Sequence, residues 1–93
     1  NYGGTTYYTK ITNAGQQATD HDQDGNKYTI YAYDLPGYDE KGSLQQLKFN
    51  ANQDRPLKMN AYLKVIYNDK KGVTDWQRVP RAEVPKAALA KLD

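Results

Sequence analysis

Alternation of apolar and polar residues with a period of two runs through most of this chain and limits its folds more than any other feature. Residues 5–12 and 27–34 are dense in β-branched and aromatic side chains, which favour strands. Apolar and polar residues alternate over residues 44–51, which predicts a strand with one face exposed to solvent. Residues 60–67 and 73–79 follow as a hairpin. The pattern therefore predicts five strands and an all-β domain.

Turn residues separate these segments at short intervals. Each of the segments 13–15, 24–26, 35–37, 41–43 and 71–72 contains a Gly, which supplies positive φ, and the first three add Asn, Asp or Pro, which also favour turns. So many short antiparallel strands in 93 residues must close or stack to hide their edges. We therefore expect one domain over residues 1–93, a small five-stranded antiparallel barrel of the OB or SH3 kind.

The C-terminal segment changes to a helical pattern. Pro85 suits the first turn of a helix, and the residues after it are strong helix formers. Val84, Ala88 and Leu92 lie at helical spacing, with Leu89 beside them. One short helix is predicted here, covering an end or edge of the sheet.

The supply of core residues is unusual. Leu, Ile, Val and Phe together make 15 of the 93 residues, below the rough 20% that warns of disorder. Nine Tyr and one Trp argue against disorder, since disordered chains are poor in aromatic residues. The core is therefore predicted to depend on tyrosine rings.

Charge and composition exclude several classes of site. The net charge of +2 is too small to indicate a nucleic-acid-binding protein, so nucleic acid is disfavoured as a partner. The absence of Cys excludes disulfides and thiolate metal sites. No apolar run approaches the length of a membrane span. The chain opens at Asn1 without Met, which we interpret as a processed product whose secretion leader is absent.

Several motifs carry a resemblance to a known family. The most specific are the Tyr-rich strand that runs into Gly37-Tyr38-Asp39-Glu40-Lys41-Gly42 and the terminal Pro85-Lys86-Ala87-Ala88-Leu89. Over about residues 8–92 the chain resembles the YxeA-like family, small proteins of Gram-positive bacteria made with a secretion signal. The resemblance implies an exported OB-like barrel, secreted or associated with the cell surface. It implies no activity, because the family has no agreed catalytic or binding residues.

An acidic loop carries the sharpest chemical motif. Asp20, Asp22 and Asp24, followed by Gly25 and Asn26, match the opening of an EF-hand-type loop. The closing Glu of that motif is absent. We therefore expect either a solvated acidic turn between two strands or a weak Ca²⁺ site made by Asp20, Asp22, Asp24 and Asn26. No other cofactor is expected.

Two aromatic features are candidates for binding. Tyr31 and Tyr33 share one strand face, where exposed rings would stack single-stranded nucleic acid or oligosaccharide and buried rings would form the core. Tyr38, Asp39 and Glu40 form a turn between two glycines, which is either a contact site or a hairpin connection whose tyrosine packs on the barrel.

The basic residues gather in the second half of the chain. Residues 55–93 carry nine Lys and Arg against four acids, whereas residues 1–54 carry four against seven. This half either meets an anionic envelope polymer or lipid headgroups, or is an ordinary solvated surface.

Catalysis is poorly supported by the residues available. Ser43 and His21 are the only Ser and the only His, and both fall in predicted loops. A chain this small also has little room for a substrate cleft. We therefore expect a non-catalytic binding module of the cell envelope or extracellular space, with a protein or polymer of the envelope as partner. The alternatives are the Ca²⁺ module and the tyrosine face.

Overall fold

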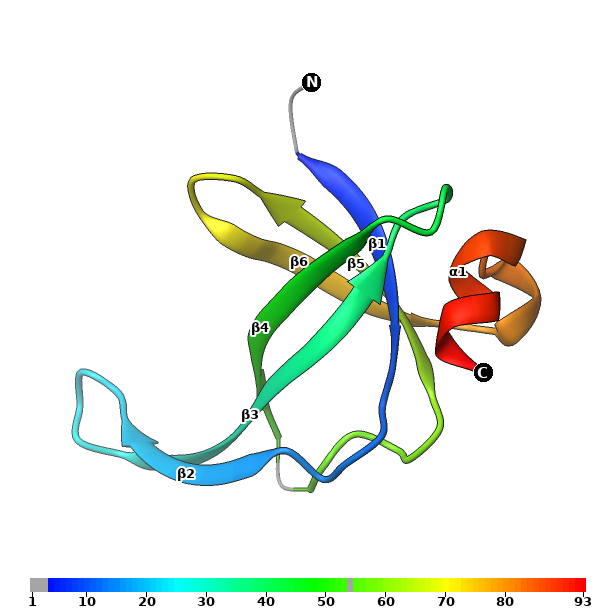
Figure 1. Ribbon diagram of the computed structural model, residues 1–93. Helices are drawn as coiled ribbons and strands as arrows, with labels where there is room; N and C mark the ends of the chain where they lie inside the picture. Colours follow the sequence, from blue (N-terminus) through cyan, green and yellow to red (C-terminus); the bar gives the residue numbers. More distant parts are fainter. Residues whose placement is uncertain (1–3, 54) are drawn as a thin grey trace.

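The alternating segments of the sequence form a curled antiparallel sheet in the computed structural model, which describes residues 4–53 and 55–93 (Figure 1). The expected all-β architecture with one short C-terminal helix is confirmed, and the curled sheet makes a half-barrel. The elements are β1 (Thr5–Lys10), β2 (Gln16–His21), β3 (Lys27–Tyr38), β4 (Leu44–Asn52), β5 (Tyr62–Asn68), β6 (Gly72–Val79), a 3₁₀ turn (Arg81–Glu83) and α1 (Lys86–Leu92).

The long strand β3 organises the sheet. One of its edges pairs with β4 from Ile30 to Tyr38. Its other edge pairs first with β2 and, at Tyr38, with Tyr8 of β1. The sheet then continues from β1 through β5 to β6, so β4 and β6 are the outer strands of the body.

The turn predicted at residues 35–37 is wrong, because β3 continues through it. The carbonyl of Pro36 faces β1, where it accepts a 2.8 Å hydrogen bond from the buried hydroxyl of Thr9. The backbone nitrogen of a strand residue points to the same side as its carbonyl, so the nitrogen of Pro36 also faces β1. The backbone pairing of β1 with β3 is at Tyr8 and Tyr38 and does not include Pro36. Proline suits this position because it has no backbone N–H that would be left without an acceptor. Gly37 is buried, and a Cβ at this position would lie 2.3 Å from a methyl carbon of Leu47.

The core lies inside the curl. The alternation of β4 places Leu47, Phe49 and Ala51 inside, as predicted, and β5 does the same with Leu63 and Val65. Each buried aliphatic side chain contributes roughly 1.5–3 kcal/mol to folding. With few such residues available, aromatic rings provide much of the remaining buried surface.

A row of aromatic rings connects the two outer strands of the body, β4 and β6. Tyr33 of β3 stacks on its cross-strand neighbour Phe49 at 5.5 Å between centroids. Phe49 also contacts Trp76 of β6 at 5.7 Å. These contacts draw β4 and β6 together, and they confirm that tyrosine is part of the core.

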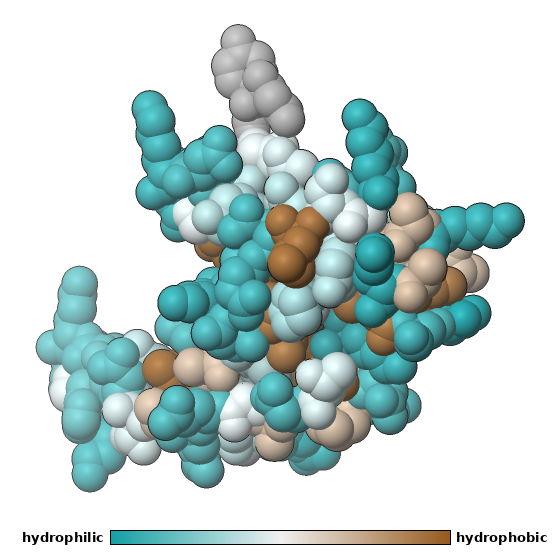
Figure 2. All heavy atoms as spheres, in the orientation of Figure 1, coloured by the Kyte–Doolittle hydropathy of each residue, from teal (hydrophilic) through white to brown (hydrophobic). Residues whose placement is uncertain are grey.

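The hairpin of β2 and β3 projects from the body as an arm (Figures 1 and 2). All six residues of β2 are exposed, and the exposure continues across the turn to Tyr28. The sheet therefore has six strands, one more than predicted. The sequence interpretation missed β2 because a strand without a buried face has no apolar alternation.

Helix α1 covers the end of the sheet beside β1 and β3 (Figure 1). Its buried residue Ala88 packs with Val84 and Val79, and this second cluster also includes Leu89, Leu92 and the half-buried rings of Tyr8, Tyr38 and Tyr62. The predicted helical spacing is confirmed, and so is the predicted position at an end of the sheet.

Candidate functional site

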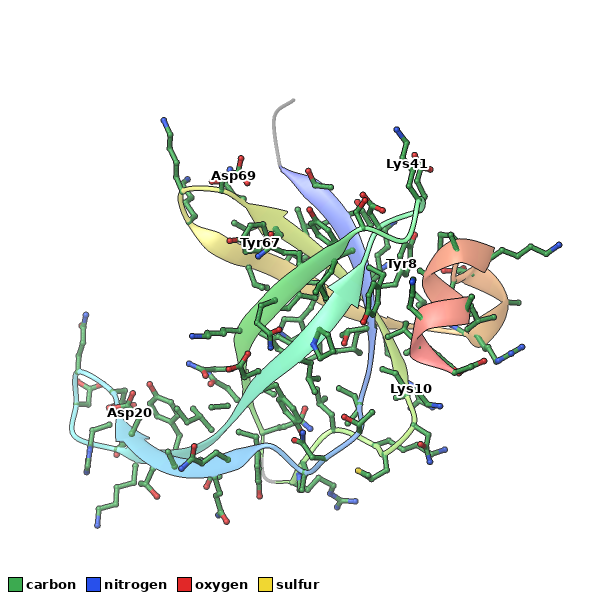
Figure 3. All side chains as sticks on the ribbon, in the orientation of Figure 1. Tyr8, Lys10, Asp20, Lys41, Tyr67 and Asp69 are labelled. Carbon is green, nitrogen blue, oxygen red and sulfur yellow. The ribbon has the colours of Figure 1, made fainter. Side chains whose placement is uncertain are left out.

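A hollow of about 590 Å³ lies between the start of β1, the turn that follows β3 and the start of α1. Tyr8 and Lys41, which both line it, lie near each other beside α1 in Figure 3. The hollow carries charges of both signs, because Asp39, Glu40, Lys41 and Lys64 all line it. Three residues with hydroxyl groups, Thr5, Thr6 and Tyr8, also line it.

The turn beside this hollow is fixed by one carboxylate. One oxygen of Asp39, Oδ1, accepts hydrogen bonds from the backbone N–H groups of Lys41 at 2.9 Å and Ser43 at 2.8 Å. The Asp39 N–H donates to the carbonyl of Ser43, and Gly42 adopts a φ of +85°. Asp39 thereby fixes the backbone of the turn, and the side chains of Glu40 and Lys41 are exposed to solvent.

Tyr38 anchors this turn to the body. Its ring is half-buried against the cluster of Val79, Val84 and Ala88, under α1. The aromatic member of the predicted contact site therefore packs on the barrel. Only Glu40 of the three predicted residues is exposed to solvent.

Acidic residues near this end of the molecule act on the phenol of Tyr7. Its pKa is raised first by burial and then by the negative charges of Asp39 and Asp69. Tyr67, whose ring meets that of Tyr7 edge-on at 6.0 Å, adds to the effect. The Tyr7 hydroxyl therefore stays neutral over the whole physiological pH range.

The tyrosine face predicted at Tyr31 and Tyr33 must be corrected. Tyr31 is 7% exposed and Tyr33 is 2% exposed, and both belong to the core. Two rings buried on the inner face of the sheet offer no surface on which bases or sugars can stack. Tyr28, on the opposite face of β3, is the exposed ring of this strand.

The acidic loop forms the tip of the arm. Asp20 lies within β2, opposite Tyr28, and Figure 3 shows it far from Lys41. Asp22 Oδ1 accepts the backbone N–H groups of Asp24 and Asn26, each at 2.9 Å. No group of three or more His, Cys, Asp or Glu within residues 4–53 and 55–93 is placed to hold a metal ion. The geometry is that of a hydrogen-bonded hairpin turn, and Ca²⁺ binding here stays a prediction.

Negative charge at the arm also raises the pKa of Tyr28, and the charge of Asp20 is the main cause. This links two exposed residues on adjacent strands. It does not involve the hollow beside Asp39.

The chain's only Ser and only His are far apart. His21 pairs with Lys27 at the start of β3, whereas Ser43 adjoins the turn after its end. The twelve residues of β3 separate them by roughly 35 Å of extended strand. These two side chains therefore cannot form a catalytic pair.

Asp93 holds the C-terminal helix against the body. Its carboxylate accepts a hydrogen bond from the Tyr62 hydroxyl at 2.5 Å and two from the Arg81 guanidinium, at 2.6 and 3.2 Å. Lys10 lies 3.5 Å away. These partners, Tyr62 first and then Arg81, lower the pKa of Asp93.

Sequence reasoning missed Tyr8 and Lys64 as members of the hollow. They face each other across β1 and β5, fifty-six positions apart in the chain. Their proximity depends on the register of that pairing, for which the sequence carries no local signal.

No helix in the described part of the chain has the length and apolar character needed to cross a membrane. No curated protein matches the chain. Three solved structures have the same fold.

One similar structure is a DUF1093 family protein from Bacillus subtilis, with 27% identity and a TM-score of 0.77 over 96% of this chain and 90% of that one. A Bacillus cereus protein described as membrane associated is 37% identical, with a TM-score of 0.71 over 94% and 81% of the two chains. A second Bacillus cereus protein, described as a candidate lipoprotein, shares the fold at 23% identity and a TM-score of 0.64, over 98% and 88%. Residues 1–82 match the family described as protein of unknown function (DUF1093), and the chain belongs to that family.

Proposed function

We propose that this chain is a non-catalytic binding module on the outer face of the cell envelope, and that it is a YxeA-like protein. The observation that carries the location is the 37% identical relative described as membrane associated, which this chain matches over 94% of its length. The relative described as a candidate lipoprotein has the same fold. The proposed site is the hollow beside Asp39.

The turn at residues 39–43 supports a binding role. Its backbone is held by four hydrogen bonds, so Glu40 and Lys41 are displayed on a preorganised loop. Preorganisation reduces the entropy lost on association. Loops held by a rigid scaffold are also common positions for binding residues.

The chemistry of the hollow favours a peptide segment as its partner. Carboxylates and ammonium groups lie in one hollow with three hydroxyls, and a peptide offers donors, acceptors and charges of both signs. A uniformly charged polymer would meet repulsion from one half of the wall. The partner is therefore a segment of another protein at the cell surface.

The location is tested by labelling intact cells that express the full-length protein with an amine reagent that does not cross membranes. Most of the ten lysines are exposed and available to such a reagent. We expect labelling without cell lysis, with a cytoplasmic protein as the unlabelled control. Labelling that requires lysis would place the protein inside the cell.

The site is tested with a matched pair of double variants. Glu40→Ala with Lys41→Ala removes one acid and one base from the hollow, whereas Asp69→Ala with Lys70→Ala makes the same change at the turn between β5 and β6. We expect only the first pair to reduce retention of the purified protein on isolated envelope membranes. Equal retention by the two variants would contradict the assigned site.

A further inference from the structure

Two adjoining hollows of about 410 and 530 Å³ lie at the opposite end of β1 and β5 from the Asp39 turn. They share the residues Ala61 and Arg78. Arg55 lines one hollow, and Arg81 lines the other. We call the two hollows together the arginine groove.

All three arginines of the chain line this groove, although they stand at positions 55, 78 and 81. Lys58 adds a fourth positive charge. Among the described residues that line the groove there is no Asp or Glu. The groove is therefore positively charged along its length, unlike the hollow beside Asp39.

The pairing of the strands explains the position of Arg78. It lies directly opposite Leu63, and cross-strand neighbours share a face of the sheet. Leu63 is 1% exposed and belongs to the core, whereas Arg78 is exposed. The arginine side chain thus leaves the inner, apolar face of the sheet at the open end of the half-barrel.

The positively charged side chains of the groove differ in whether they form a salt bridge. Arg81 donates to Asp93, which neutralises part of its charge. For Arg55, Lys58 and Arg78 the described residues provide no carboxylate within salt-bridge distance. Three exposed cations therefore remain available to an anion.

The groove combines these cations with an apolar floor. Ala61 and Leu63 are buried beneath it, and Pro56 and Leu57 are half-buried at its wall. An apolar wall lowers the local dielectric constant and strengthens attraction between charges. A guanidinium also matches two oxygens of a phosphate at once, which a lysine cannot do.

We propose that the arginine groove binds a linear anionic polymer through its phosphate groups. The two hollows meet at Arg78, and Arg55 and Lys58 line one of them, so successive phosphates of an extended chain meet these three cations. The carbon skeleton between the phosphates lies against the apolar floor. A planar bilayer surface fits two concave hollows less well. This site is separate from the hollow beside Asp39, and its test does not depend on where the protein resides in the cell.

The probe is a short poly(glycerol phosphate), titrated into the isotopically labelled protein and followed by amide NMR. We expect saturating shifts at residues of the groove and an affinity that falls as salt rises. Arg78→Gln should weaken binding about tenfold, because it removes a charged donor shared by both hollows. Lys71→Gln removes one positive charge from an exposed turn outside the groove and should leave the affinity unchanged.

Arg78→Lys separates geometry from charge. It keeps the positive charge and loses the planar fork, so its affinity should lie between those of the wild type and Arg78→Gln. All these side chains are exposed, and unchanged amide spectra of the free variants will show that the fold is retained.

Three results would overturn the proposal. The first is an absence of shifts at the groove with the polymer. The second is an equal loss of affinity in Arg78→Gln and Lys71→Gln, which would mean attraction to net charge alone. The third is binding to vesicles of equal parts phosphatidylglycerol and phosphatidylcholine without binding to the polymer, which would assign the groove to a lipid surface.

Discussion

The phenol oxygen of Tyr33 accepts a hydrogen bond of 2.8 Å from the backbone N–H of Leu57. Tyr33 lies in the core on β3, whereas Leu57 belongs to the irregular segment between β4 and β5. One buried ring thus holds in place the segment that carries the wall of the arginine groove. The same ring stacks on Phe49, so it serves the core and the groove together.

Tyr33→Phe should lower the free energy of unfolding by about 1–2 kcal/mol, because the half-buried N–H of Leu57 loses its partner. The ring contact with Phe49 is retained. Chemical denaturation measures the loss, and faster amide exchange at Leu57 locates it. Tyr38→Phe is the control, since no hydrogen bond of that hydroxyl is found within the described residues. A similar loss in both variants would contradict a specific role for the Tyr33 hydroxyl.

Gly4→Ala should destabilise the protein more than Gly25→Ala. Both glycines have positive φ, +89° and +84°, so each substitution costs about 1–2 kcal/mol in backbone strain. At Gly4 the new Cβ would also lie 2.1 Å from the backbone oxygen of Tyr67, whereas at Gly25 it meets open space. The clash at Gly4 should add about 1–3 kcal/mol. Equal thermal midpoints for the two variants would refute this difference.

The contact between Asp93 and its partners should make stability depend on pH in acid. The pKa of Asp93 is lower in the folded protein than its ordinary value of 3.8, chiefly because Tyr62 and Arg81 donate hydrogen bonds to the carboxylate. A lowered folded pKa stabilises the fold above the unfolded pKa, and this stabilisation is lost as pH falls through the folded value.

Asp93→Asn removes this titration. The wild type should be more stable than the variant at neutral pH, and the difference should shrink as the pH falls below about 3.8. Denaturation curves over a pH series provide the measurement. A difference that grows toward acid pH would show that the sign is wrong.

Asp22→Ala should loosen the arm without affecting the body. The substitution removes the carboxylate oxygen that accepts the N–H groups of Asp24 and Asn26. A loss of about 1 kcal/mol speeds amide exchange in β2 roughly fivefold. Asp22→Asn keeps an acceptor oxygen and should behave as the wild type. Asp24→Ala, at a side chain that the turn does not use, is a second control. Global unfolding of Asp22→Ala would contradict the independence of the arm.

The elements that the sequence predicted correctly are those with one buried face. Residues 44–51 alternate because Leu47 and Phe49 face the core while Lys48 faces solvent, and this alternation is local. The spacing of Ala88 and Leu92 in α1 is local too. Such patterns depend only on neighbouring residues, so a single sequence contains them.

The elements that sequence reasoning missed depend on the surroundings. β2 is held by its backbone pairing with β3. Its side chains are all exposed, so they show no apolar alternation that would predict a strand. Pro36 continues a strand because Thr9, distant in the sequence, bonds to its carbonyl. The tyrosine composition left Tyr31 and Tyr33 open as core or surface, and only the curl of the sheet places them inside. The position of Arg78 in the groove depends on the register of β5 and β6, which places it opposite Leu63.

The arm also sets a rule for how members of this family can vary in length. Because Asp20 faces Tyr28 and His21 faces Lys27, removing these four residues together would shorten the hairpin by two rungs. Every remaining side chain would stay on the same face of the hairpin. The turn at Asp22 would keep its conformation and lie closer to the body. Loss of one residue from a single strand would instead shift the register of the pairing between β2 and β3. Insertions and deletions should therefore accumulate here as balanced multiples of two, making the reach of the arm an adjustable dimension of an otherwise constant scaffold.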